Sequence, residues 1–372
     1  MLRGLESILR YETTWNDPQS EQNQLSHPRE MSDTELATFL LADVMRFRRM
    51  ASSESSCESA FCQECQAPHL QKVLDAITQQ KPITFVLPAF PGKSPNTAKV
   101  FGTLPDMAER CALEFLQSVC DRIQRYYAPG AQIILCSDGR AFSDVVGMRD
   151  EDVTAYQDEL AQMIERLNLT SLTTFNLEEL YSCTDYDALR TQLMAQYGES
   201  LEALKASVSR GKAHDASIED REANRLYCGI TRFLVEDAMH PGQTRSRTNI
   251  QKDCRVRSYL VIQRSKAWGE LIAERFPEAI RLSIHPQSCG SKKLGIRLIE
   301  PDQWQTPWHG VAVQVGARFV LLKRAQAEAL GGHLVMRFGR PSHFVLPERR
   351  AELDRPGALD YSQALDLEGA QP

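Results

Sequence analysis

The chain reads ITFVLPAFPGKSPN at residues 83–96 and QIILCSDGRAFSD at residues 132–144. Each stretch is a short apolar run, rich in β-branched residues, that breaks into Gly, Pro, Ser, Asp and a basic residue. This is the pattern of a buried strand followed by a loop. Because one well-marked helix is expected between the two runs, they predict a β-α-β unit with a parallel sheet. We therefore predict an α/β fold: a Rossmann-like, mostly parallel sheet flanked by helices, with a helical N-terminal extension and a β-rich C-terminal part.

The helix between the two strands is expected to run from Leu104 to Tyr127, because apolar residues recur there at helical spacing. Thr103 and Asp106 suggest a capping box, and Pro129-Gly130 ends the helix. Residues 137–144 are expected to form a loop. Other predicted helices cover residues 33–47, 150–167, 219–238 and 245–275, and residues 205–215 are expected to form an exposed loop. Predicted strands cover residues 172–175, 279–284, 294–299, 311–316, 319–322 and 333–338.

The composition is that of an ordinary soluble protein, with 42% apolar and 25% charged residues. A net charge of −6 argues against general nucleic-acid binding. We expect no membrane association, because no apolar run approaches the roughly 20 residues that span a bilayer. No secretory signal is recognisable at the N-terminus, so the ten cysteines suggest free thiols in the cytoplasm.

Three regions are expected along the chain. Residues 1–56 form an N-terminal extension, poorly ordered at first and then helical. Residues 57–346 form the catalytic domain, and the charged residues 347–372 form a flexible tail. Neither a Walker A motif nor a G-x-G-x-x-G motif is present, so the standard nucleotide-binding fingerprints are missing.

Candidate binding groups follow the first predicted strand. In open α/β sheets, ligands bind outside the carboxyl ends of the strands. Lys93 lies in a Pro-bounded loop together with Ser94 and Asn96, and Lys99 follows. A lysine held in such a loop could bind an anion or, if desolvated, act as a catalytic amine. The alternative is an ordinary solvated loop lysine.

A second candidate set follows the next strand. Asp138, Arg140 and Asp144 could together bind the ammonium and carboxylate groups of an amino acid. The alternative is an ion pair that only shapes the turn. The predicted helix over residues 245–275 adds a local positive field with Lys252 and Arg255, since opposing acids are scarce there. A solvated basic helix face is the alternative for this set.

His285 and His309 each end an apolar run beside Pro or Gly, and either could be a general acid or base. A structural histidine is the more common case, and spacing does not rank the two. Lys293 and Arg297 supply further positive charge near His285.

A separate motif, Cys57-x4-Cys62-x2-Cys65-x3-His69, has donors suited to a structural Zn²⁺. The usual second pair of zinc ligands is not found downstream. Spare thiols in a loop are therefore an equal alternative.

Six blocks of this sequence are distinctive: residues 85–96, 99–109, 137–144, 283–287, 293–297 and 306–310. In the same order, these blocks resemble the isonitrile (isocyanide) synthases of the pyoverdine/dityrosine biosynthesis family. The resemblance covers roughly residues 60–345.

The resemblance implies a lyase-type reaction that requires no cofactor. The α-amine of an amino acid, first L-tyrosine and next L-tryptophan, would condense with ribulose 5-phosphate, whose C2 would become the isonitrile carbon. A downstream iron/2-oxoglutarate-dependent oxygenase would act on the product in secondary metabolism. No facial triad for such an iron is evident in this chain, so it would be the synthase alone.

On the basis of this resemblance, we expect specific roles for some of the candidate residues. Lys93, Lys252 and Arg255 would bind phosphate, and Arg140 would bind the substrate carboxylate. Asp138 or Asp144 would accept protons from the amine, and His285 or His309 would move protons. The alternatives are another α/β transferase acting on a phosphorylated small molecule, or a non-catalytic ligand-binding protein.

Overall fold

A computed structural model describes residues 31–51, 57, 60–181, 185–299 and 305–347. Residues 31–346 form one compact unit. The predicted disorder of residues 1–30 lies outside the described residues, as does nearly all of the predicted tail. None of the helices in the described part of the chain is long and apolar enough to cross a membrane.

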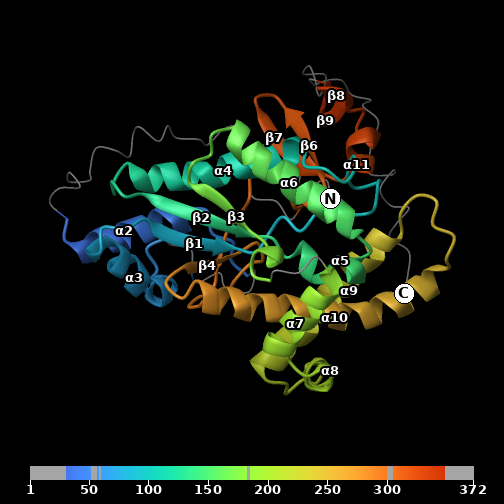
Figure 1. The fold of residues 1–372 in the computed structure, drawn as a ribbon, viewed down its shortest axis with the longest axis horizontal. Helices are drawn as coiled ribbons and strands as arrows, with labels where there is room; N and C mark the ends of the chain where they lie inside the picture. The colour runs from blue at the N-terminus through green and yellow to red at the C-terminus, as the bar shows by residue number, and fades with distance from the viewer. Residues whose placement is uncertain (1–30, 52–56, 58–59, 182–184, 300–304, 348–372) are drawn as a thin grey trace, which may run out of the picture. The chain divides into compact units, whose positions relative to one another are not determined.

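The centre of this unit is a five-stranded sheet in which every strand pairing is parallel, as the sequence predicted (Figure 1). Side chains alternate across it: Phe85 and Leu87 belong to one core, and Val86 belongs to the other. The strand order is β3 (Leu172–Phe175), β2 (Ala131–Cys136), β1 (Ile83–Leu87), β4 (Ile280–Ser283) and β5 (Leu294–Gly295).

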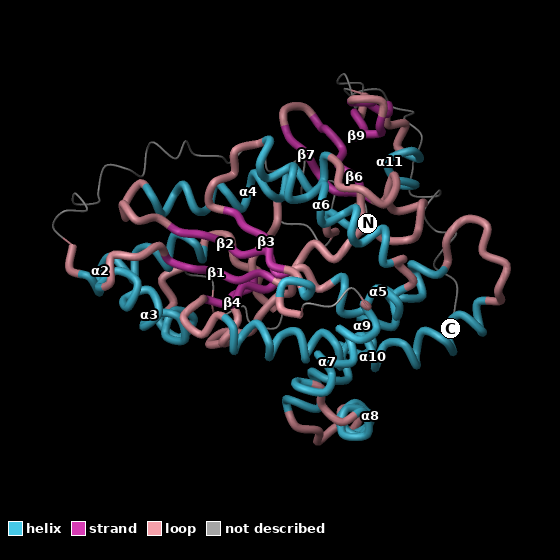
Figure 2. Tube along the Cα trace, in the orientation of Figure 1, coloured by secondary structure: helices cyan, strands magenta, loops and turns pink. Residues whose placement is uncertain are grey.

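Helices cover both faces of the sheet, which explains why its strands are apolar on both sides (Figure 2). The core on the first face includes α2 (Asp33–Met45), α3 (Gln63–Thr78), α4 (Met107–Gln124) and α6 (Asp150–Arg166). The core on the second face includes α5 (Gly139–Val146), α7 (Tyr186–Tyr197), α9 (Ile218–Ala238) and α10 (Arg247–Arg275). The short helix α8 (Leu201–Arg210) packs on α9 and α10.

A second sheet forms the predicted β-rich C-terminal part. Its central pair, β6 and β9, is parallel, and its outer pairs are antiparallel. The strand order is β7 (Arg318–Leu322), β6 (Val311–Val315), β9 (Arg340–Val345) and β8 (His333–Arg337). The sequence predicted three of these strands and missed β9. The 3-10 helix η5 (Pro307–His309) precedes β6, and α11 (Arg324–Ala329) follows β7.

Three sequence-based predictions of elements were wrong, and the helix α3 was not predicted. Residues 137–144, expected to be a loop, form most of α5, and α8 extends into the predicted loop of residues 205–215. The helix α4 starts after Asp106, not near Thr103. Asp106 is itself the N-cap: its carboxylate accepts a hydrogen bond from Ala108 N, and Glu109 reciprocates by accepting one from Asp106 N.

Candidate active site

The order of the strands locates the expected ligand site. From β1 the chain continues to β2 and β3 on one side, whereas β4 and β5 lie on the other. The order therefore reverses between β1 and β4. In open α/β sheets, ligands bind in the crevice outside the carboxyl ends of the strands at such a switch point. The segment after β1 carries residues 88–99, and the segment after β4 carries His285.

The loops after β1 and β2 are in close contact. Phe90 is fully buried and has a φ of 59°, a left-handed conformation that is strained for an aromatic residue. Ser137 Oγ donates a hydrogen bond to Phe90 O at 3.0 Å. A Cβ atom at Gly139 would lie 1.7 Å from Pro91 O, so only glycine fits there. This combination of strain and close approach is typical of functional loops.

The segment that contains η5 docks on the loop after β1, more than 200 residues away in sequence. Ser94 N donates to Trp308 O at 2.8 Å, and Lys93 Nζ donates to Pro307 O at 3.0 Å. The ring of Phe90 packs edge-on against Trp308 at 5.3 Å. These contacts bring two of the blocks that carried the family resemblance into one place.

Four side chains meet around a buried carboxylate and form what we call the Asp237 cluster: Ser94, Lys99, Asp237 and His309. Asp237 Oδ1 accepts hydrogen bonds from Ser94 Oγ and from Lys99 Nζ, both at 2.6 Å. Asp237 Oδ2 lies 3.6 Å from His309 Nε2. The other ring nitrogen, His309 Nδ1, is 2.9 Å from Thr306 Oγ1. The cluster therefore joins a histidine, a carboxylate, an ammonium group and a hydroxyl.

Asp237 is the fixed anion of this cluster. Burial alone would raise its pKa, but His309 and Lys99 outweigh burial and lower the pKa to about 2. The ring of Phe233 packs edge-on against His309 at 4.6 Å. Asp237 and Phe233 thus contact the His309 ring from two sides, and the His309 side chain remains 20% exposed. A histidine held in this way, with access to solvent, can exchange protons with a bound molecule.

A rim of further charge surrounds the cluster. Glu236 Oε2 is 3.2 Å from Lys99 Nζ and 3.1 Å from Lys323 Nζ, and the Lys323 side chain is 35% exposed. Asn96 Nδ2 donates to Glu236 O at 2.7 Å, so Asn96 ties the loop after β1 to the end of α9. Of the two lysines that pair with Glu236, Lys323 is the more accessible.

Lys93 is fully buried in its own ionic network. Its ammonium group lies 2.9 Å from Asp106 Oδ2 and 2.7 Å from Glu109 Oε2, and Tyr156 Oη donates to Glu109 Oε1 at 3.1 Å. Burial lowers the pKa of Lys93, but the two carboxylates raise it by more. Burial, reinforced by Glu109, raises the pKa of Asp106 to about 7 despite Lys93. Phosphate binding by Lys93, as predicted from the sequence, would require this ammonium group to exchange protein partners for the ligand.

Asp138 lies at the carboxyl end of β2 and at the N-cap of α5. Burial raises its pKa to about 7, although a backbone N–H and Arg281 act in the opposite direction. Its Oδ1 atom is buried and has no hydrogen-bond partner among the described residues. A carboxyl group that titrates near neutral pH and keeps one oxygen free has the properties of a general acid or base.

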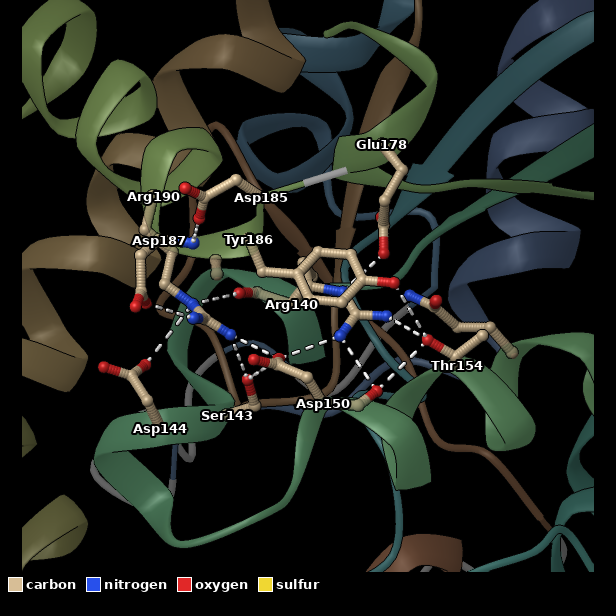
Figure 3. Close-up of polar contacts among 12 residues, drawn as sticks. Arg140, Ser143, Asp144, Asp150, Thr154, Glu178, Asp185, Tyr186, Asp187 and Arg190 are labelled. Atoms are coloured by element: carbon tan, nitrogen blue, oxygen red, sulfur yellow. Dashed lines mark hydrogen bonds and ion pairs between the residues drawn. The ribbon is translucent and has the colours of Figure 1, made fainter. Parts of the chain in front are cut away.

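Arg140 is enclosed by protein groups (Figure 3). Its Nε donates to Glu178 at 2.5 Å, Nη1 to Asp150 Oδ1 at 2.8 Å, and Nη2 to Thr154 Oγ1 at 2.6 Å. The guanidinium also stacks on the Tyr186 ring at 3.7 Å. Its side chain is fully buried. Carboxylate binding by Arg140 would therefore displace partners that it already has.

The remaining predicted residues are dispersed. Asp144 pairs with Arg264 at 2.5 Å and with Arg190 at 3.4 Å. Lys252 and Arg255 are exposed on α10. The structure does not bring them to Lys93, which is enclosed by the network described above.

His285 lies on the segment after β4 and is exposed at the surface. Partial desolvation by the surrounding protein and the positive charges of Arg49 and Lys293 lower its pKa. Arg297 lies further along the chain. It donates to Arg46 O at 3.1 Å and lies over the Phe47 ring.

The zinc motif has a different set of partners from the one expected. The Sγ atoms of Cys57, Cys62, Cys65 and Cys289 lie within 4.8 Å of one another. His69 is not part of this group. It is buried in α3, where burial lowers its pKa to about 4.

Sequence reasoning missed Glu236, Asp237 and Lys323. A signal for Asp237 was present: it follows Ile230, Phe233 and Leu234 at helical spacing and interrupts the apolar face of α9. A carboxylate on an apolar face must find a partner when it is buried. The identity of that partner depends on tertiary structure, which the pattern does not contain.

Residues 73–335 match the family described as pyoverdine/dityrosine biosynthesis proteins. An L-tryptophan isonitrile synthase, AmbI2, of Fischerella ambigua is 45% identical over 314 residues, which are 84% of this chain and 92% of that protein. An L-tyrosine isonitrile synthase of Pseudomonas aeruginosa is 43% identical, over 86% of this chain and 97% of that protein. The crystal structure of the PvcA protein from Pseudomonas aeruginosa matches with a TM-score of 0.78 and 45% identity, and covers 84% of this chain and 100% of PvcA. The chain therefore belongs to the pyoverdine/dityrosine biosynthesis family, to which the sequence blocks had pointed.

Proposed function

We propose that this protein is an amino-acid isonitrile synthase, a lyase-type enzyme that converts the α-amino group of L-tyrosine, or next of L-tryptophan, to an isonitrile. One observation carries the proposal: relatives named for this activity align over 92–97% of their own length at 43–45% identity. One tryptophan enzyme and one tyrosine enzyme are each 45% identical to this chain, and a second enzyme of each kind is 40% and 43% identical, respectively. Overall identity therefore does not select the side chain.

Ribulose 5-phosphate supplies the isonitrile carbon in this proposal. The amine condenses with the C2 ketone and water leaves. Carbon–carbon cleavages and loss of phosphate then remove the rest of the sugar. These steps need an anion-binding cation for the phosphate and groups that move protons. No cofactor is required. The product would pass to a separate iron/2-oxoglutarate-dependent oxygenase.

The Asp237 cluster suits the proton transfers. His309 is the proposed general acid and base, since its ring is partly exposed and is held by Thr306 Oγ1 at 2.9 Å and by Asp237 at 3.6 Å. Asp237 acts as a positioning residue that orients this ring. Asp138 is the proposed acceptor for the amine proton, because burial raises its pKa to about 7.

Phosphate is proposed to bind at the rim of the same cluster. Lys323 is the more accessible cation there, and Lys99 lies beside it on the shared partner Glu236. The assignment of Lys93, Lys252 and Arg255 to phosphate remains a prediction from the sequence. It would fail if Lys93→Ala left turnover with ribulose 5-phosphate intact.

The test is to incubate purified protein with ribulose 5-phosphate and, separately, tyrosine, tryptophan, valine or leucine. An isonitrile infrared band with tyrosine or tryptophan supports the proposal. A thermal shift with sugar phosphates but no isonitrile from any amino acid would favour a different transferase and contradict it.

A further inference from the structure

Four cysteine side chains from two distant segments converge beside the sheet. Cys57, Cys62 and Cys65 precede or begin α3, and Cys289 lies on the segment after β4. The Sγ–Sγ distances are 3.2 Å between Cys57 and Cys65, 3.4 Å between Cys65 and Cys289, and 3.7 Å between Cys62 and Cys289. All four sulfur atoms lie within 4.8 Å of one another.

These distances match a metal site better than disulfides. A disulfide requires about 2.0 Å between sulfur atoms. Four thiolates at about 2.3 Å from a tetrahedral Zn²⁺ lie about 3.8 Å apart, because a tetrahedron fixes the ratio between these lengths. The three distances given above fall just below that value, so small movements would complete the tetrahedron. A set of four sulfur ligands in this arrangement selects zinc or iron over harder cations.

The local electrostatics also favour a bound cation. Cys62 is the N-cap of the 16-residue helix α3, and Cys65 lies in its first turn, where the helix dipole stabilises a thiolate. Four close thiols cannot all ionise without a compensating positive charge.

We propose that Cys57, Cys62, Cys65 and Cys289 bind one Zn²⁺ in a closed, structural site. All four positions of the tetrahedron are filled by protein thiolates, so no position is open to substrate. The proposal is independent of the proposed isonitrile activity. It also replaces the sequence-based ligand His69 with Cys289, a residue that no spacing rule could connect to the other three.

The site would fasten the segment after β4 to the segment before α3. The two are already joined by backbone hydrogen bonds: Gln287 N donates to Arg49 O at 3.0 Å, and Ala51 N donates to Gln287 O at 3.0 Å. Cys289 is two residues beyond this pairing. Bound zinc would therefore fix the position of the segment after β4. This segment leaves the sheet at the switch point and carries His285.

The first test is elemental analysis of protein purified without chelators, for the wild type and three variants. We expect about one zinc per chain in the wild type, in His69→Gln and in the control Cys228→Ser, whose thiol is exposed outside the cluster. Cys289→Ser should contain far less than one zinc per chain. Loss of zinc in His69→Gln, with full retention in Cys289→Ser, would overturn the ligand set.

A second measurement covers the case in which Cys289→Ser does not fold. Wild-type protein loaded with Co²⁺ in place of Zn²⁺ should show intense sulfur-to-cobalt charge-transfer absorption and the visible bands of a tetrahedral ion. Removal of zinc with a chelator should lower the melting temperature. Wild-type protein that contains iron at this site would contradict the proposal. So would protein whose four thiols are reduced but bind neither Zn²⁺ nor Co²⁺, or protein in which the four cysteines are paired as disulfides.

Discussion

His309 Nε2 lies 3.6 Å from Asp237 Oδ2, and the same carboxylate accepts a hydrogen bond from Lys99 through its other oxygen at 2.6 Å. The Asp237 carboxylate on α9 thus links a histidine of η5 to a lysine from the loop after β1. The arrangement resembles the base–orienter pairs of acid–base enzymes, in which a carboxylate fixes the histidine ring.

His309→Gln is expected to reduce kcat by roughly 100-fold or more, because positioned acid–base groups contribute on this scale. Asp237→Asn should reduce kcat less and change the pH profile of kcat/KM, since the ring loses its anionic partner. The matched controls are His214→Gln, an exposed histidine, and Asp253→Asn, a carboxylate paired on α10. Steady-state kinetics across pH 6–9 measures the effect. Wild-type kcat and pH profile in His309→Gln would exclude the role.

Lys323→Ala should raise the KM for ribulose 5-phosphate about tenfold, the typical effect of losing one charge-assisted contact. The KM for the amino acid should change little, because Lys323 is proposed to contact only the phosphate. Lys212→Ala, an exposed lysine outside the cluster, serves as the control. An equal rise in both KM values would show that the phosphate does not bind at this rim.

Asp138 predicts a pH dependence of stability. Burial raises its pKa from the ordinary 3.8 to about 7, so the folded state binds more protons than the unfolded state between these values. This residue therefore destabilises the fold progressively as pH rises from about 4 to 7. Asp138→Asn should remove that contribution. The melting temperature of the variant, measured relative to that of the wild type, should therefore be higher at pH 8 than at pH 5. The control is Asp121→Asn, which changes an exposed carboxylate. A melting-temperature difference between Asp138→Asn and wild type that does not vary with pH would contradict the prediction.

Arg140→Met should lower the free energy of unfolding by about 3–5 kcal/mol, because Asp150 and Glu178 would lose a buried partner. The control is Arg149→Ala, because the Arg149 side chain is 74% exposed and its ion pair with Asp152 should contribute little to stability. Urea unfolding of both variants measures the difference. A cost below about 1 kcal/mol for Arg140→Met would show that the network in Figure 3 does not stabilise the fold.

The sequence alone predicted the parallel sheet and the family. Residues 83–87 and 131–136 form strands whose apolar pattern and abrupt ends depend only on local chemistry. The sequence also selected Ser94, Lys99 and His309, because each lies in a distinctive block near a strand or turn. It missed Asp237, which becomes significant only when α9 packs beside the loop after β1.

Long-range partners explain the other differences. Cys289 is 224 residues from Cys65, so local spacing suggested His69 instead. Arg140 appeared to be a ligand-binding cation, because the sequence does not show that Asp150, Thr154 and Glu178 surround it. The segment that forms α5 was predicted to be a loop because a glycine such as Gly139 often indicates a turn. In the structure, glycine is required at this position because Pro91 O lies too close for a Cβ atom.

The most direct test of the account is to supply ribulose 5-phosphate labelled with ¹³C at C2, together with L-tyrosine or L-tryptophan, and to analyse the product by mass spectrometry. We expect a product that has gained one labelled carbon and lost two hydrogens relative to its amino acid, with the label in the isonitrile group. An isonitrile without the label, or no isonitrile from either amino acid with folded protein, would contradict it.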